Sequence, residues 1–371
     1  MDKKTVFILC GSVIGILVAL IFGLWVFTLF NNKSYDFSDV EELIVEATDK
    51  YYRENPAYLP TDDGKYNLSF SSLTEGGYIE PLGELIEGGE VCSAAIVVVK
   101  KGDVYTYIPK LNCGELYITK TLSEQILETN QVVSEGSGLY KRDDNTYYYR
   151  GKINNNYVAF GGHVKKGEEI ANMWRIISIE DGKVKLLGLS GFEKRTSWDN
   201  RYNTTINKQS GYNDFNSSIL SDYLKSMETN YEYLDEKLMA KIEPINLCIG
   251  KRELQDDKDK GFIECDTLSE KTYLFGTLTP FEYISASIDE DCKSMSTYAC
   301  RNFNYLSFQQ NQQWLMTTSA KNDYEAYTFE GRSFDVSTVM YQNYIFPTIV
   351  LNEFAFFNGG SGTLEDPYTI K

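Results

Sequence analysis

The longest uninterrupted apolar pattern in the chain covers residues 5–30, which carry no charge. About 20 apolar residues span a bilayer, so this run is long enough to cross one with some tilt. It exceeds the roughly 7–15 residues of a signal-peptide core and lacks a small-x-small cleavage site. Lys3 and Lys4 precede it and a single Lys33 follows, which predicts a cytoplasmic N-terminus. We therefore expect 1–34 to be a cytoplasmic tip and a single-pass transmembrane signal-anchor helix in the cell membrane, followed by extracellular domains.

Small residues recur at every fourth position within this run, at Gly11, Gly15, Ala19 and Gly23. On a helix they would form one smooth ridge, which lets a second backbone approach closely. The ridge predicts self-association or packing against a partner helix. Glycine is also common in membrane helices, so a simple tether remains the alternative.

The pattern changes to an amphipathic one beyond this run. Apolar residues recur every three or four positions over 36–52, which predicts a helix that ends before Pro56. Alternating residues at 94–99 and 104–108 then predict two strands of a hairpin. Together these elements predict a small α+β domain over 35–120.

The second half of the chain holds two strong local patterns. Residues 174–179 and 183–187 alternate around Asp181-Gly182, which predicts a hairpin with a type I′ turn. The sequence Thr279-Pro280-Phe281-Glu282 is a capping box with proline at the first helical position, so a helix is expected at about 280–288.

The domain organisation follows from these patterns. A segment containing several serines and glycines, 121–138, is predicted to be a linker that begins with a short helix near 122–127, and 139–371 a larger α+β domain. Further strands are expected at 314–319, 326–329, 336–339 and 346–351. The predicted fold class is therefore α+β, with an N-terminal transmembrane helix and two domains outside.

Composition narrows the classes of partner. The formal net charge is −17, which argues against nucleic acid and against docking on anionic lipid. Aromatic residues make up 14% of the chain, enough to build a substantial core rather than a disordered segment.

The chain has seven cysteines, of which Cys10 lies in the apolar run. An even number outside it is typical of disulfides in an oxidising compartment. Of 15 connectivities, proximity along the chain favours three pairs. A structural zinc site is disfavoured, because there is no CxxC and only one histidine. The favoured pairs are Cys92–Cys113, Cys248–Cys265 and Cys292–Cys300.

Candidate catalytic and metal-binding groups are few. His163 follows two glycines, but no serine or cysteine nucleophile is coupled to it in sequence. Three acids over 256–261 could offer calcium ligands, but two lysines interleave, so a solvated loop is favoured. Trp198-Asp199-Asn200 is similar to a lectin calcium motif in the wrong order, and a turn beside a buried tryptophan is favoured there. No catalytic or metal residue is assigned and no cofactor is expected, with calcium as the open alternative.

Aromatic side chains near polar residues are the remaining candidates for ligand contact. Carbohydrate sites combine rings, which stack on sugar faces, with amides and carboxylates, which bind hydroxyls. Aromatic residues also fill cores, so no single one is assigned to a ligand. The candidates are Trp198, Tyr202, Tyr212, Trp314 and Tyr341.

The first extracellular segment resembles pilin-like proteins. The resemblance is carried by KYYRENPAYLPTDDGKYNLSFSSLTEGGYIEPL and the two cysteines that follow, and it covers residues 35 to about 115. It implies an amphipathic helix, tyrosine-rich turns and a small antiparallel sheet. The chain departs from type IV prepilins, which carry a glutamate early in the mature helix, because no charge lies between Lys4 and Lys33.

Residues 138–371 resemble a family of uncharacterised surface domains of Gram-positive bacteria. The motifs that carry this are MWRIISIEDGKVKLLG, WDNRYN, GYNDFNSSILSDYL, LTPFEYISAS and GGSGTLEDPYTI, in the order of the family. The resemblance implies an α+β domain related to the C-type-lectin-like and sulfatase-modifying-factor folds. One strand departs from the family, with Phe346-Pro347-Thr348 in place of Arg-Pro-Val.

These observations predict a membrane-anchored bacterial surface protein with an extracellular binding or adhesion role. The expected ligand is a sugar or a protein, and nucleic acid is not expected. One alternative is a structural component of a pilin-like or secretion-type assembly. A second is an envelope enzyme that acts on glycans, since 53 acids make carboxylate pairs certain but uninformative.

Overall fold

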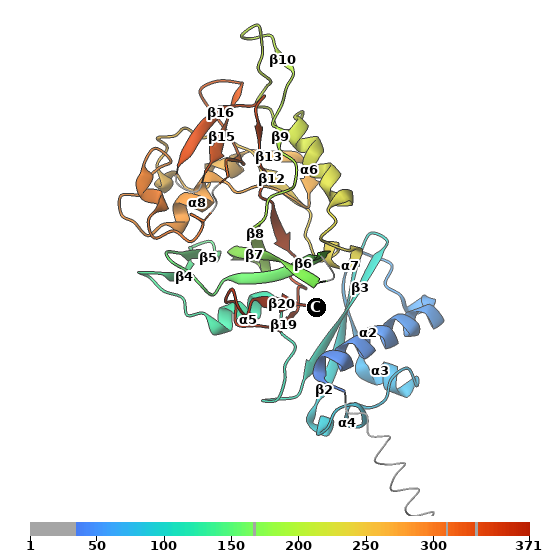
Figure 1. The fold of residues 1–371 in the computed structure, drawn as a ribbon. Coiled ribbons are helices and arrows are strands. Elements are labelled where there is room, and N and C mark those ends of the chain that lie inside the picture. The colour runs from blue at the N-terminus through green and yellow to red at the C-terminus, as the bar shows by residue number, and fades with distance from the viewer. Residues whose placement is uncertain (1–34, 166–167, 309–310, 331–332) are drawn as a thin grey trace, which may run out of the picture. The chain divides into compact units, whose positions relative to one another are not determined.

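A computed structural model describes residues 35–371, apart from 166–167, 309–310 and 331–332 (Figure 1). The chain divides into an N-terminal unit that ends at Thr119 and a C-terminal unit over Lys120–Lys371. The predicted linker 121–138 belongs to the C-terminal unit. It contains helix α5 (Leu122–Thr129), whose Leu122 and Ile126 are fully buried in that unit's core.

The N-terminal unit consists of a helix packed on a three-stranded antiparallel sheet. Helix α2 (Phe37–Glu54) begins at the N-cap Asp36 and buries Val40 and Ile44, on the apolar face expected from the sequence. The sheet has the order β1-β2-β3, and the ring of Tyr52 on α2 stacks on Tyr107 of β3 at 5.7 Å. The remaining elements are β1 (Gly64–Ser69), β2 (Ser93–Lys101), β3 (Val104–Asn112), α3 (Phe70–Glu75), α4 (Leu82–Leu85), η1 (Pro56–Tyr58) and η2 (Gly89–Val91).

The β2–β3 hairpin positions the first disulfide. Lys101 pairs with Val104, so the turn is shorter than the four residues 100–103 predicted. Ser93 pairs with Asn112 at the other end, which places Cys92 opposite Cys113, and these two residues are bonded. The other two disulfides are Cys248–Cys265 and Cys292–Cys300, so all three pairs favoured by proximity are present.

Replacing both Cys92 and Cys113 with serine is expected to lower the free energy of unfolding of the N-terminal unit by about 3 kcal/mol. The bond joins residues 21 positions apart, and its loss restores loop freedom to the unfolded chain. Urea denaturation of the full chain measures the change. The matched control is Cys292→Ser with Cys300→Ser, which should leave the transition of the N-terminal unit where it is. An unchanged transition in the first variant would contradict the expectation.

The C-terminal unit is built on an eight-stranded sheet. Its strands follow the order β18-β8-β7-β6-β20-β19, with β5 also paired to β7 and β4 paired to β5. The β20–β6 pair is parallel, and the other pairs are antiparallel. The strands are β4 (Gly138–Lys141), β5 (Tyr147–Arg150), β6 (Tyr157–Lys165), β7 (Glu168–Glu180), β8 (Lys183–Gly188), β18 (Thr348–Leu351), β19 (Phe357–Gly359) and β20 (Tyr368–Ile370).

The predicted β7–β8 hairpin is confirmed. Its turn residues Asp181 and Gly182 have φ of 49° and 79°, the positive values that a type I′ turn requires. Helix α5 contacts β8, and α8 contacts β5 on the opposite side of the sheet (Figure 1). Helix α8 (Pro280–Ala286) carries the predicted capping box between Thr279 and Glu282.

The chain between β8 and β18 forms smaller elements above this sheet. They include a three-stranded sheet, β14-β15-β16, and three two-stranded pairs. The bounds are β9 (Thr196–Ser197), β10 (Tyr202–Asn203), β11 (Lys208–Gln209), α6 (Ile219–Asn230), α7 (Glu236–Met239), β12 (Ile245–Cys248), η3 (Lys258–Lys260), η4 (Ile263–Asp266), β13 (Leu268–Tyr273), η5 (Tyr298–Arg301), β14 (Gln313–Thr318), β15 (Glu325–Phe329), β16 (Phe334–Thr338) and β17 (Gln342–Asn343).

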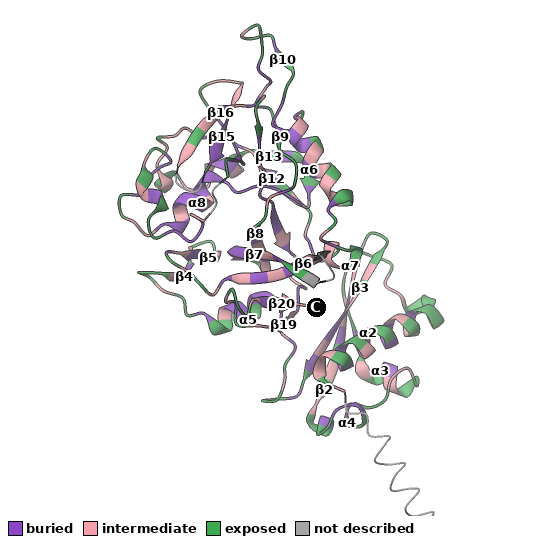
Figure 2. Ribbon diagram, viewed as in Figure 1, coloured by how far each residue is buried: buried purple, intermediate pink, exposed green. Residues whose placement is uncertain are grey.

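Three tryptophans lie at the centre of the C-terminal unit. Trp174, Trp198 and Trp314 are fully buried, and the rings of Trp198 and Trp314 meet edge to face at 5.9 Å. Figure 2 shows buried residues along β7 and β8, in contrast to α2, where buried and exposed residues alternate. One continuous apolar core therefore joins the eight-stranded sheet to the elements above it.

The predicted fold class is wrong as stated. The described residues form a mixed α/β structure with more strand than helix. No helix among them is long and apolar enough to cross a membrane. The 18-residue α2 has the length but is amphipathic, with acids along its outer face. The apolar run 5–30 and its ridge, Gly11, Gly15, Ala19 and Gly23, lie outside the described residues.

Candidate functional site

A cleft of about 550 Å³ lies in the C-terminal unit, between the eight-stranded sheet and the segment that includes α8. This volume is within the range of small-molecule sites. Residues of β5, β7, β8 and β18 line it from the sheet, and residues of β12, η4 and α8 line it from the other side. We call the first group the floor and the second the roof.

The floor is polar because the strands alternate. Tyr148 pairs with Ser178, Ser178 with Lys185 and Lys185 with Val350, so these four residues form one row across four strands. All four line the cleft. The intervening residues, such as Val184 and Leu186, point to the opposite face and are buried in the core.

An ion pair joins the floor to the roof. Lys185 on β8 binds the Glu282 carboxylate, whose side chain is only 7% exposed. The other oxygen of Glu282 accepts hydrogen bonds from the backbone N–H and the hydroxyl of Thr279, both at 2.9 Å. Glu282 thus caps α8 and binds the sheet with the same carboxylate, which fixes the width of the cleft.

A second, fully buried ion pair supports the roof. Arg252 and Glu264 are both 0% exposed, and two guanidinium nitrogens each donate to the carboxylate at 2.9 Å. Glu264 also accepts from the N–H of Phe281, in the first turn of α8, at 3.1 Å. The neighbouring disulfide Cys248–Cys265 lines the cleft wall. These contacts hold η4 and α8 together as one wall.

Arg142 places a guanidinium at the edge of the cleft. Its Cζ lies 4.8 Å from the ring centroid of Tyr148 and 5.6 Å from that of Phe281. Its Nε is buried and has no hydrogen-bond partner. Cation–π contacts with one ring of the floor and one of the roof therefore fix this side chain.

Three ionisable groups of the cleft have altered acidity, and one of them is the Tyr305 hydroxyl, whose pKa is raised by burial. The backbone N–H of Thr146 donates to Asp144 at 2.9 Å and lowers the pKa of that carboxyl. Burial raises the pKa of the Tyr149 hydroxyl well above its ordinary value. Asp144 is therefore an anion and Tyr149 a neutral phenol at neutral pH.

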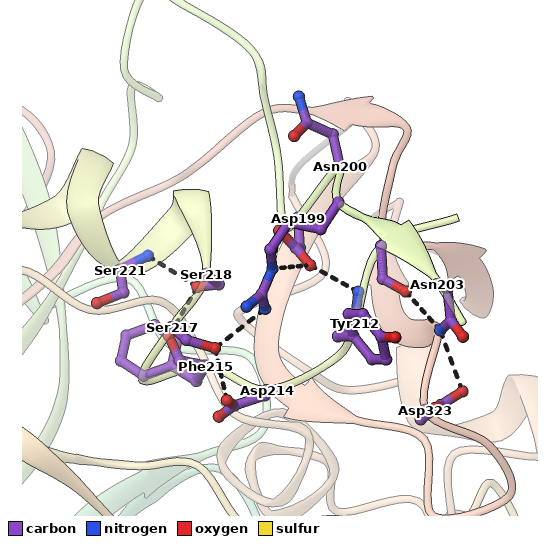
Figure 3. A network of polar contacts seen from close by, with 12 residues as sticks. Asp199, Asn200, Asn203, Tyr212, Asp214, Phe215, Ser217, Ser218, Ser221 and Asp323 are labelled. Atoms are coloured by element: carbon purple, nitrogen blue, oxygen red, sulfur yellow. Dashed lines mark hydrogen bonds and ion pairs between the residues drawn. The ribbon is translucent and has the colours of Figure 1, made fainter. Parts of the chain in front are cut away.

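The motif WDNRYN forms a polar network in another part of the C-terminal unit (Figure 3). Both oxygens of Asp199 accept from Arg201 Nε, at 3.0 and 2.9 Å, and one also accepts from the N–H of Tyr212 at 2.7 Å. Asn203 donates to Asp323 at 3.3 Å and to the carbonyl of Gly211 at 2.7 Å. The network orders its own loops, as expected for a turn beside the buried Trp198.

The aromatic candidates are not gathered at one site. Trp198 and Trp314 are core residues with no exposed surface. Tyr202 and Tyr341 are 53% and 61% exposed, and neither lines the cleft. Tyr212 is half-buried, with Arg201 at 5.4 Å from its ring.

The candidate metal and catalytic residues do not come together as a site in the described part of the chain. Asp256 binds Lys260 at 2.5 Å, and Asp257 accepts from the N–H of Asp259 at 2.8 Å, so the acids of 256–261 order their own turn. Among the residues that the structure describes, no group of three or more His, Cys, Asp or Glu could hold a metal ion. The backbone of His163 pairs with Ile170, and its side chain lies outside the described part.

Sequence reasoning missed Arg142, Ser178 and Lys185 as members of one site. The alternation of β7 and β8 predicts that Ser178 and Lys185 lie on the same face of the sheet. Nothing in the pattern shows which segment covers that face. Arg142 belongs to GLYKRDDNTYYYRG, where basic residues and tyrosines pair across β4 and β5. That pairing was the available signal.

Comparisons with family models, with curated proteins and with solved structures find no match to the chain. The resemblances to pilin-like proteins and to Gram-positive surface domains therefore stay predictions from motifs. The three disulfides are compatible with an extracellular protein, since such bonds persist in oxidising compartments.

Proposed function

We infer that the protein is an extracellular binding protein and that its cleft holds a sugar. The observation that carries this proposal is a cleft of about 550 Å³ whose lining mixes rings, hydroxyls and charged groups. Sites of this kind fix a ligand by a few placed polar groups on an aromatic wall. The disulfides agree with a location outside the cell.

The choice of a sugar follows from the chemistry of the lining. A sugar ring presents hydroxyls at its edge, which need both donors and acceptors, and C–H groups on its face, which pack on aromatic rings. The cleft supplies all of these. Among the lining residues, the donors include Arg142, the acceptors Asp144 and Glu180, the hydroxyls Ser178 and Ser285, and the rings Tyr148, Phe262 and Phe281.

Substituting Ser178→Trp is expected to weaken glycan binding at least tenfold. Ser178 lies in the middle of the floor row, so an indole there fills the space that a ligand needs. Binding of the full chain to an array of bacterial-surface and plant glycans measures the effect, with urea denaturation to show that the variant folds.

The matched control is Ser190→Trp, the same change at an exposed position outside the cleft lining. It should bind as the unsubstituted chain does. Two results would refute the proposal: an array on which no glycan is bound, or a Ser178→Trp variant that binds as well as the control.

A further inference from the structure

We propose that the cleft selects sugars that carry a carboxylate, and that Arg142 binds this group. The inference rests on the proposed function and names its ligand class, the uronic acids and related acidic sugars. It is based on the guanidinium of Arg142, which the rings of Tyr148 and Phe281 hold in place and whose buried Nε has no hydrogen-bond partner.

Arg142 is in no direct ion pair with a residue of the described ranges, although Asp144 acts on it from a longer distance. None of the ion pairs among the residues that the structure describes includes it, and its buried Nε has no acceptor. A buried N–H without a partner costs free energy, about 1–3 kcal/mol and more in a charged group. A carboxylate is the ligand that matches a guanidinium best, because its two oxygens accept two parallel N–H bonds.

The other cations of the cleft are already engaged. Lys185 binds Glu282, and Lys183 binds Glu243 at 3.3 Å. Arg142 is therefore the cleft cation that remains available, within the described ranges, to a ligand. A lysine in its place would lack the planar fork and the stacking between two rings.

The two rings that contact Arg142, those of Tyr148 and Phe281, are held in place by further aromatic contacts. Tyr148 lies 6.0 Å from Tyr140, and the guanidinium of Arg150 lies 4.7 Å above Tyr140 on the same hairpin. On the roof, Phe281 packs against Phe262 at 5.0 Å. The guanidinium is thus preorganised, so that little side-chain freedom is lost when an acid binds.

The acids of the cleft limit how much negative charge it accepts. Asp144, which is bound to the N–H of Thr146, acts electrostatically on Arg142, while Glu180 and Asp181 are exposed on the rim. A ligand with one carboxylate meets Arg142 alone, whereas a ligand with several anionic groups is repelled by these acids and by the net charge of −17. A single acidic sugar unit therefore fits better than a polyphosphate.

The test uses arrayed uronic-acid oligosaccharides beside the same compounds with their carboxyl groups methyl-esterified. The full chain should bind at least one acid form ten times more tightly than its ester, and raised salt should reduce the difference. Arg142→Gln should remove the preference, because it weakens binding of the acid form more than binding of the ester. Arg142→Lys, which keeps the charge, should retain only part of the preference. If the Gln variant does not fold, the Lys variant tests the inference in its place.

The control is Lys183→Gln, which removes a cleft cation that already has an acidic partner and should keep the preference. Equal binding of acid and ester, or an unchanged preference in Arg142→Gln, overturns the inference. If only neutral glycans bind and Ser178→Trp blocks them, the inference fails while the proposed function stands. If no glycan binds at all, both fail.

Discussion

Replacing Arg252 with methionine is expected to lower the free energy of unfolding of the C-terminal unit by about 3–5 kcal/mol. The substitution removes two of the hydrogen bonds that Glu264 accepts and leaves its carboxylate buried. Among the described residues, the backbone N–H of Phe281 is then its one remaining hydrogen-bond donor. An uncompensated charge inside a protein is one of the few single changes that costs this much. Urea denaturation of the full chain, followed by far-ultraviolet circular dichroism, measures the loss.

Two further variants separate this cause from a general loss of packing. Arg252→Met combined with Glu264→Leu should recover much of the stability, because no charge is then left behind. Lys260→Met breaks an ion pair between the exposed Lys260 and the partly buried Asp256 in the same region, and it should cost no more than about 1 kcal/mol. A cost below 1 kcal/mol for Arg252→Met, or a double variant as unstable as the single one, would contradict the explanation.

Raising the pH from 10 to 12 is expected to unfold the C-terminal unit. Burial raises the pKa of Tyr231, Tyr283 and Tyr327 from 10.0 to about 12. Above pH 10 the unfolded chain loses these phenolic protons while the folded chain keeps them, so stability falls with rising pH. The hydroxyls of Tyr231 and Tyr283 each account for roughly 2–3 kcal/mol, which is fully present below pH 10 and lost as the pH rises through about 12.

Ultraviolet difference absorbance of tyrosinate, recorded beside circular dichroism, tests this expectation. The buried tyrosines should ionise together with the loss of structure. Tyr283→Phe should make the alkaline loss smaller, although it also removes the hydrogen bond with Ser307. Tyr202→Phe, on the exposed β10–β11 hairpin, should change nothing. If all tyrosines ionise while circular dichroism still shows a folded chain, the expectation of alkaline unfolding is contradicted.

Local features of the fold were predictable from the sequence because they depend on near neighbours. The capping box of Thr279 and Glu282 needs four consecutive residues, and the turn at Asp181-Gly182 needs two. The disulfide Cys92–Cys113 followed from the hairpin between its cysteines. The helix at 36–52 was correct in its apolar face and within two residues at its end.

The cleft was not predictable, because its parts are distant in sequence. Arg142 meets Phe281, and Lys185 meets Glu282, only after the sheet and α8 have packed. The helix predicted near 122–127 is present as α5, but its place in the core was not predictable, since the burial of Ile126 depends on the rest of the C-terminal unit.

The parallel pairing of β20 with β6 has a consequence for how the protein is made. Tyr368 pairs with Val158, and β19 joins the sheet only through β20, so this edge of the sheet is completed only when residues 368–370 are in place. During synthesis, β4 to β8 leave the ribosome long before their last partners. The full eight-stranded sheet therefore forms only after synthesis has passed residue 370.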